Sequence, residues 1–111
     1  MKIVKALTLG LKKVYIIYSQ KRLAFEFDKQ KSRSNYQKHG IDFVKAQKLW
    51  HDENAIEDEA DTIEEKRYRR TGEIDGISYT AYFTWRNDKV RLISVRRARK
   101  NEVDEYDKNK C

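Results

Sequence analysis

Residues 66–97 have the sequence KRYRRTGEIDGISYTAYFTWRNDKVRLISVRR, and this stretch decides the fold. It contains three runs typical of β-strands, at 66–71, 77–86 and 89–97. Turn residues lie between the runs, around Asp75-Gly76 and at Arg86-Asn87-Asp88. In the middle run apolar and polar side chains alternate, which is typical of a strand with one buried face. The simplest arrangement is an antiparallel meander.

Helix signals lie on both sides of this stretch. Asp28 is placed to cap a helix over 29–38 that ends at Gly40, and Asp42 is placed to cap a second helix. Asn101 is placed to cap a closing helix. The second helix repeats apolar residues on one face, namely Phe43, Ala46, Leu49 and Trp50. The sequence therefore predicts an α+β fold: a small antiparallel sheet with two N-terminal helices and a C-terminal helix.

Charge is distributed unevenly along the 111 residues. Residues 1–22 hold six Lys and Arg and no acid, so they contribute +6 of the net charge of +7. Residues 52–65 hold eight acids and no base, which predicts a solvated loop or an edge segment rather than core. We expect one domain over 25–111, preceded by a basic extension at 1–24.

The role of the extension stays open. Lysines 12 and 13 split its apolar run, and no small-residue cleavage site follows Tyr18, which argues against a secretory signal. A basic helix at a membrane surface, an extra packed element and translated sequence upstream of the real start are the other interpretations.

Composition excludes several classes. The single cysteine, Cys111, rules out an intrachain disulfide and favours a reducing, cytoplasmic location. No stretch has the roughly 20 apolar residues that a membrane span needs. The acids of 52–65 lack a metal-ligand spacing, and neither a glycine-rich phosphate loop nor a nucleophile elbow is present. We therefore expect no metal site and no cofactor.

Basic residues gather at the end of the third predicted strand. Paired guanidiniums there could bind phosphate oxygens bidentately, although charges also protect an edge strand from aggregation. Alternation places Arg91 and Arg97 on one face and Arg96 on the other with Leu92, unless a bulge shifts the register. The run consists of Arg86, Lys89, Arg91, Arg96, Arg97, Arg99 and Lys100.

Two further groups have residue types suited to acid–base chemistry. Glu65 and Arg67, two apart on a strand, project to the same side and form either a base with a phosphate clamp or a surface ion pair. Lys38 and His39 lie at a helix end, where His39 either transfers protons or complements the helix dipole.

Taken in order, these pieces resemble the BrnT toxin family over about residues 25–107. Two separated blocks carry most of the resemblance, Asn35-x-x-Lys38-His39-Gly40 and Arg91-Leu92-Ile93-Ser94-Val95-Arg96. Val95 stands where the family usually has alanine, and the basic extension lies outside the resemblance. The other matching positions are Phe27, Asp28, Lys31, Ile41, Phe43, Ala46, Asp52, Glu65, Arg67, Gly72, Ala98, Glu102 and Tyr106.

The resemblance implies a RelE-like fold and a bacterial type II toxin-antitoxin system. The toxin would cleave RNA without metal, inhibit translation and arrest growth. Its antitoxin would be a DNA-binding BrnA-like protein, and the assembly a homodimer or a heterotetramer with that antitoxin. The catalytic candidates carried over by position are Lys38, His39, Glu65, Arg67, Arg91 and Arg96.

Metal-free cleavage uses the ribose 2′-hydroxyl as nucleophile, so it needs a base, a stabiliser of phosphorane charge and an acid. Glu65 or Lys38 is the candidate base, Arg67 and Arg91 the stabilisers and His39 the candidate acid. Two other functions use the same arginines: a noncatalytic RNA- or ribosome-binding module, and an interaction protein for an acidic partner. The residues expected to bind RNA outside the reaction centre are Arg86, Lys89, Arg97, Arg99 and Lys100.

Overall fold

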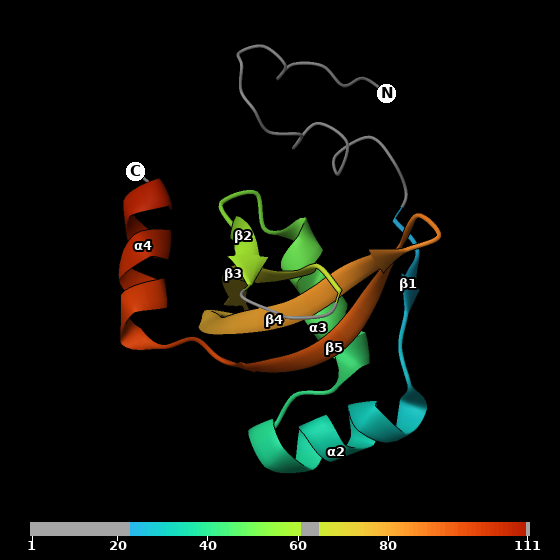
Figure 1. Cartoon of the computed structure of the whole chain (residues 1–111). Coiled ribbons are helices and arrows are strands. Elements are labelled where there is room, and N and C mark those ends of the chain that lie inside the picture. The colour runs from blue at the N-terminus through green and yellow to red at the C-terminus, as the bar shows by residue number, and fades with distance from the viewer. Residues whose placement is uncertain (1–22, 61–64, 111) are drawn as a thin grey trace.

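The computed structural model describes residues 23–60 and 65–110, so nearly all of the basic extension lies outside the described residues. A five-stranded mixed sheet is its centre, with the order β1-β5-β4-β3-β2 (Figure 1). The elements in chain order are β1 (Phe25–Glu26), α2 (Lys29–His39), α3 (Phe43–Ala46), the 3-10 helix η2 (Gln47–His51), β2 (Ile56–Ala60), β3 (Arg67–Ile74), β4 (Ile77–Arg86), β5 (Lys89–Arg97) and α4 (Lys100–Lys110).

The predicted meander is confirmed. β4 and β5 have the predicted bounds, and β3 runs three residues further than expected. Both turns between them have two residues of positive φ: Asp75 and Gly76 at 52° and 81°, Asn87 and Asp88 at 53° and 65°. Two consecutive left-handed residues twist the chain in the sense that joins adjacent antiparallel strands.

The sheet is not purely antiparallel, which corrects the sequence prediction. The two-residue strand β1 pairs in parallel with β5, with Phe25 opposite Val90. Part of the acidic segment forms the edge strand β2, antiparallel to β3. Two of its three acids lie opposite bases on β3: Asp58 pairs with Arg69 in the register and Glu57 with Arg70. This opposition of charge stabilises a strand whose three central residues are acidic.

The predicted helix starts are right for α2 and α3 and wrong for α4. Asp28 accepts hydrogen bonds from the first turn of α2, and Gly40 ends that helix with φ 77°. Asp42 caps α3 in the same way. Asn101 lies inside α4 instead of capping it, because the carboxylate of Glu102 accepts the backbone N–H of Arg99 at 2.8 Å.

The apolar core lies on one face of the sheet, under α2, α3 and η2. Trp50 of η2 stacks edge-on against Phe25 and Phe83, which joins three elements. α2 is held by the buried Asn35, whose amide donates to the carbonyls of Ile41 and Val95 at 2.9 and 2.8 Å and accepts the N–H of Val95 at 3.2 Å. The two motif blocks of the sequence are thus in direct contact.

Helix α4 is anchored at the end of the sheet through Asp52. One carboxylate oxygen of Asp52 accepts the Tyr106 hydroxyl at 2.6 Å and the N–H of Glu73 at 2.8 Å. Burial favours the neutral carboxyl, but these hydrogen bonds outweigh it and lower the pKa of Asp52. A Cβ at Gly72 would lie 3.0 Å from the same oxygen, so any other residue here would crowd this hydrogen-bonded carboxylate.

Candidate nucleic-acid interface

The face of the sheet opposite the core is not covered by α2, α3 or η2, and α4 reaches it only at one end, where Glu102 accepts hydrogen bonds from Thr80 and Arg96 (Figure 1). We call it the open face. The side chains of β3 that alternate with core residues project from it, as do their cross-strand partners on β4 and β5. The residues of the open face are Arg67, Arg69, Thr71, Thr80, Tyr82, Thr84, Arg91, Ser94 and Arg96.

A β-bulge decides which arginines of β5 reach this face. Tyr82 pairs with Ser94, whereas the next residue, Phe83, pairs with Leu92, so Ile93 is the extra residue. Arg91 opposite Thr84 and Arg96 opposite Thr80 therefore share the open face. Arg97, opposite Tyr79, lies on the other side. The prediction from strict alternation, that Arg91 and Arg97 share a face, is wrong. The reason is the bulge, a possibility that the prediction had left open.

The arginines at one end of the open face are held by weak, partly exposed ion pairs. Arg67 and Arg86 lie 3.9 and 3.7 Å from carboxylate oxygens of Glu65, and Arg91 lies 3.2 Å from Glu26. Such pairs contribute about 0–1 kcal/mol, so a phosphate can replace the carboxylate at little cost. The Nε of Arg67 is buried and has no hydrogen-bond acceptor among the described residues.

Arg96, at the other end, is held firmly. Its guanidinium donates to both carboxylate oxygens of Glu102 at 2.9 Å and to the Tyr82 hydroxyl at 3.0 Å. These bonds to Glu102 raise the pKa of Arg96 and lower the pKa of Glu102 to about 2. Both side chains are mostly buried, with 17% and 14% exposed. Arg96 therefore ties the open face to α4.

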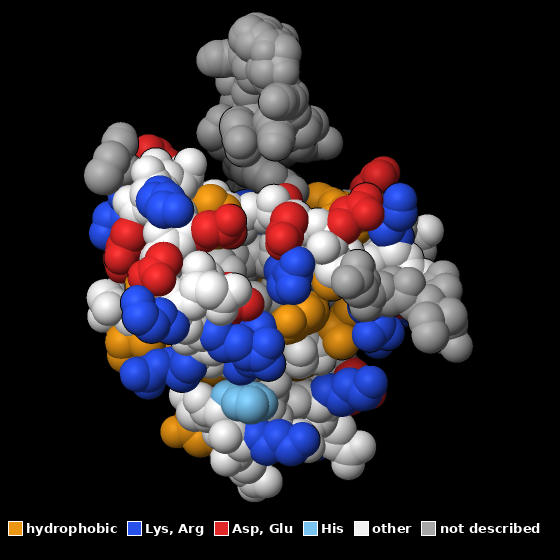
Figure 2. Space-filling model, turned by 60° about the vertical axis from the view of Figure 1, so that its left-hand side comes forward, with side chains coloured by type: hydrophobic (Ala, Val, Ile, Leu, Met, Phe, Trp, Pro, Cys, Tyr) orange, Lys and Arg blue, Asp and Glu red, His pale blue; other side chains and the backbone are white. Residues whose placement is uncertain are grey.

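The other predicted catalytic residues lie at the end of α2. Lys38 and His39 are exposed, and His39 is one helical turn after Asn35, on the side of α2 that contacts β5. Figure 2 shows one face of the molecule, on which Lys and Arg side chains lie around a histidine side chain. The structure thus divides the catalytic candidates into three groups. Arg67, Glu65 and Arg91 lie at one end of the open face, Arg96 lies at the other end with Glu102, and Lys38 and His39 lie at the end of α2.

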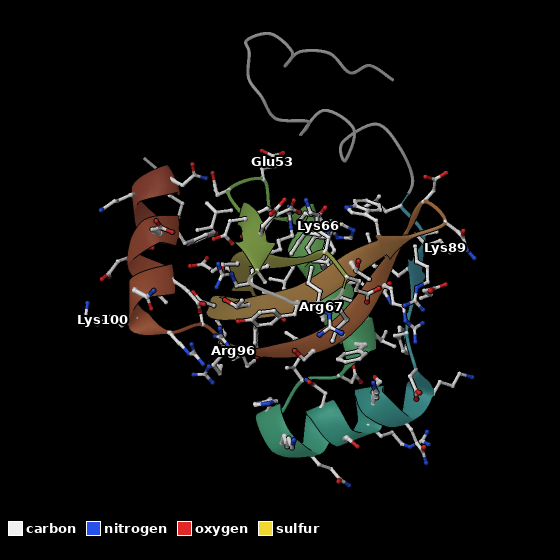
Figure 3. The ribbon with its side chains drawn as sticks, viewed as in Figure 1. Glu53, Lys66, Arg67, Lys89, Arg96 and Lys100 are labelled. Atoms are coloured by element: carbon white, nitrogen blue, oxygen red, sulfur yellow. The ribbon has the colours of Figure 1, made fainter. Side chains whose placement is uncertain are left out.

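The predicted RNA-binding residues frame the sheet. Lys89, beside the β4–β5 turn, and Lys100, at the start of α4, lie at opposite ends of it, with Arg67 and Arg96 between them (Figure 3). Arg97 and Arg99 are exposed where β5 leads into α4. Basic side chains therefore follow the length of the sheet.

Among the open-face residues that the sequence candidates omit, Arg69 and Tyr82 have the side chains best suited to phosphate binding or proton transfer. Arg69 binds Asp58 through two hydrogen bonds of 3.1 and 2.8 Å, and it lies opposite Tyr82 in the register. The signal for Tyr82 was present in the alternation of 77–86, which puts it on the polar side of its strand. Without the fold, nothing distinguished it from the other tyrosines.

A hollow of about 400 Å³ lies away from the open face, between η2, the β3–β4 turn and α4. Two pairs of its polar groups bind each other: Tyr106 donates to Asp52, and Lys110 lies 3.7 Å from Glu73. Burial and the hydrogen bond to Asp52 raise the pKa of Tyr106. These contacts give the hollow a structural role in seating α4.

The fold and the open face define a class, a small α+β domain whose uncovered sheet presents arginines. The chain matches the family described as the ribonuclease toxin, BrnT, of type II toxin-antitoxin system, over residues 27–102. It belongs to this family, which confirms the resemblance found in the sequence. No protein of curated function matches the chain.

Membership of this family gives the chain a general role. It is a ribonuclease toxin of a type II toxin-antitoxin system, with RNA as substrate and an antitoxin as partner. None of the described helices is long and apolar enough to cross a membrane.

Proposed function

We propose that the chain is a cytoplasmic, metal-independent endoribonuclease that arrests growth by cutting RNA needed for translation, and that the open face is its active site. One observation carries the proposal: Arg67 on β3 and Arg91 on β5 flank β4 near Thr84, and among the described residues each is held by a partly exposed carboxylate, Glu65 at 3.9 Å and Glu26 at 3.2 Å. Two guanidiniums across one strand suit a phosphate that gains charge in the transition state.

In the reaction, the 2′-oxygen of the ribose attacks phosphorus and the 5′-oxygen leaves, which produces a 2′,3′-cyclic phosphate. Arg67 and Arg91 stabilise the phosphorane charge, and Glu65 or Lys38 takes the 2′-hydroxyl proton. His39 is the acid candidate from sequence. The tight contacts of Arg96 with Glu102 and Tyr82 support a positioning role for it.

RNA would continue along the basic side chains that frame the sheet, Arg86, Lys89, Arg97, Arg99 and Lys100. The partner would be a BrnA-like antitoxin with a DNA-binding module, in a homodimeric or heterotetrameric assembly. An antitoxin that covers the open face would offer carboxylates to the same arginines, since Glu26, Asp58 and Glu65 already occupy them within the chain.

We expect the purified chain, freed of antitoxin, to cleave RNA in excess EDTA and to leave 2′,3′-cyclic phosphate ends. Among the described residues no three His, Cys, Asp or Glu side chains are grouped to hold a metal ion. The Arg67→Ala variant, purified in the same way, controls for contaminating nuclease. Activity that disappears in EDTA and returns with magnesium would contradict this mechanism. Salt-sensitive RNA binding without any cleavage would instead support the noncatalytic module.

A further inference from the structure

Tyr82 lies at the centre of the open face, and it is not one of the catalytic candidates that the family resemblance gave. It is half-buried on β4, between Arg69 on β3 and Ser94 on β5. On the same face of β4, Thr84 is two residues away, a spacing of about 7 Å along a strand. A phosphate bound between Arg67 and Arg91 would therefore lie about one pair of residues along the strand from Tyr82.

Two arginines lie beside Tyr82 on the open face. Arg96 donates to the phenolic oxygen at 3.0 Å, and its charge centre lies 5.4 Å from the centre of the ring. Arg69 lies opposite Tyr82 on β3, and its bond to Asp58 raises its pKa. Both guanidiniums are fixed by carboxylates, Arg96 by Glu102 and Arg69 by Asp58.

The direction of the hydroxyl proton follows from this geometry. A phenolic oxygen has two acceptor positions and one O–H, and arginine can only donate. Arg96 occupies one acceptor position of the hydroxyl, so the O–H can be donated to a third group. The open face is where a bound RNA would supply that group.

We propose that Tyr82 is the general acid of the cleavage reaction and gives its hydroxyl proton to the departing 5′-oxygen. As the bond between the 2′-oxygen and phosphorus forms, the bond from phosphorus to the 5′-oxygen breaks, and the proton of Tyr82 completes the new 5′-hydroxyl. The phenolate that remains is stabilised by the two guanidiniums and regains a proton from water. This role rests on the proposed ribonuclease function and replaces His39 as the acid.

The assignment also explains why carboxylates bind Arg96 and Arg69 tightly. Their carboxylate partners keep the guanidiniums from turning toward the substrate phosphate, so their charge stays at the phenol. His39, by contrast, lies on the exposed end of α2 rather than on the sheet. Arg67 and Arg91 remain the phosphate ligands.

The test compares leaving groups in single-turnover cleavage by the full chain. Tyr82→Phe keeps the ring and removes only the hydroxyl. We expect it to slow cleavage of ordinary RNA by about 100-fold or more, the usual contribution of a general acid. The second substrate is an RNA with sulfur in place of the 5′-bridging oxygen, whose leaving group needs no proton. On this RNA we expect the variant to cleave within about threefold of wild type, a difference much smaller than the contribution of a general acid. Tyr79→Phe, on the core side of the same strand, should cleave both substrates like wild type.

Three outcomes would overturn the assignment. Equal slowing on both substrates would give Tyr82 a structural role, and no slowing on ordinary RNA would leave its hydroxyl without one. A wild-type chain that cleaves neither substrate would overturn the ribonuclease proposal itself.

Discussion

Arg67→Ala and Arg91→Ala should each slow RNA cleavage by about 100- to 1,000-fold, the usual cost of removing a preorganised donor to developing charge. Overexpression of either variant should no longer arrest growth. The fold should tolerate both changes, because each breaks only an ion pair at 3.9 or 3.2 Å that contributes about 0–1 kcal/mol. Single-turnover rates and thermal melts of the purified variants measure the two effects separately.

Two further variants sharpen this comparison. Arg33→Ala removes the same charge from the exposed surface of α2, away from the open face, and should cleave RNA like wild type. Arg67→Lys keeps a charge but loses the planar fork, so it should recover only part of the rate. If both alanine variants cleaved as fast as Arg33→Ala, the open face would not be the active site.

Asn35→Ala should lower the free energy of unfolding by about 3 kcal/mol or more. The side chain is 7% exposed, and its removal leaves the carbonyls of Ile41 and Val95 and the N–H of Val95 without their partner. Each buried polar group that loses its hydrogen bond costs about 1–3 kcal/mol. A small domain has only about 5–15 kcal/mol of stability in total, so this change should be visible in urea denaturation.

A matched control and a second variant identify the cause. Asn101→Ala, on the exposed side of α4, should stay within about 0.5 kcal/mol of wild type. Asn35→Asp retains the shape but loses both donated bonds, so it should be destabilised at least as much as Asn35→Ala. An Asn35→Ala variant within 1 kcal/mol of wild type, on the scale of a single exposed hydrogen bond, would show that α2 is held by packing alone.

Sequence patterns predicted the parts of the fold that depend on local chemistry. Apolar alternation and left-handed turn residues gave β4 and β5 their bounds, and Asp28 and Gly40 gave those of α2. β1 was not predicted, because a strand of two residues shows no periodicity and its pairing with β5 is a long-range contact. The edge strand β2 carries acids where a strand usually carries apolar residues, so only its arginine partners on β3 explain it.

The candidate site could be predicted less completely. The residue types were right for the arginines, but the bulge at Ile93 changed which of them share a face. Contacts across the sheet then separated them further: Glu102 holds Arg96, whereas Arg67 has an Nε without an acceptor among the described residues. Tyr82 became a candidate only when the fold placed Arg96 on its hydroxyl and Arg69 opposite it on β3.

The most direct test of the central claim, that RNA binds the open face, is an NMR titration. A ¹⁵N-labelled chain would be titrated with a short 2′-O-methyl RNA, which lacks the nucleophile and stays intact. RNA bound on the open face should cause the largest shifts at the amides of Arg67, Tyr82, Thr84 and Arg91, and these shifts should be smaller in the Arg67→Ala variant. Shifts confined to α2 and α3, with the amides of β3, β4 and β5 unchanged, would contradict it.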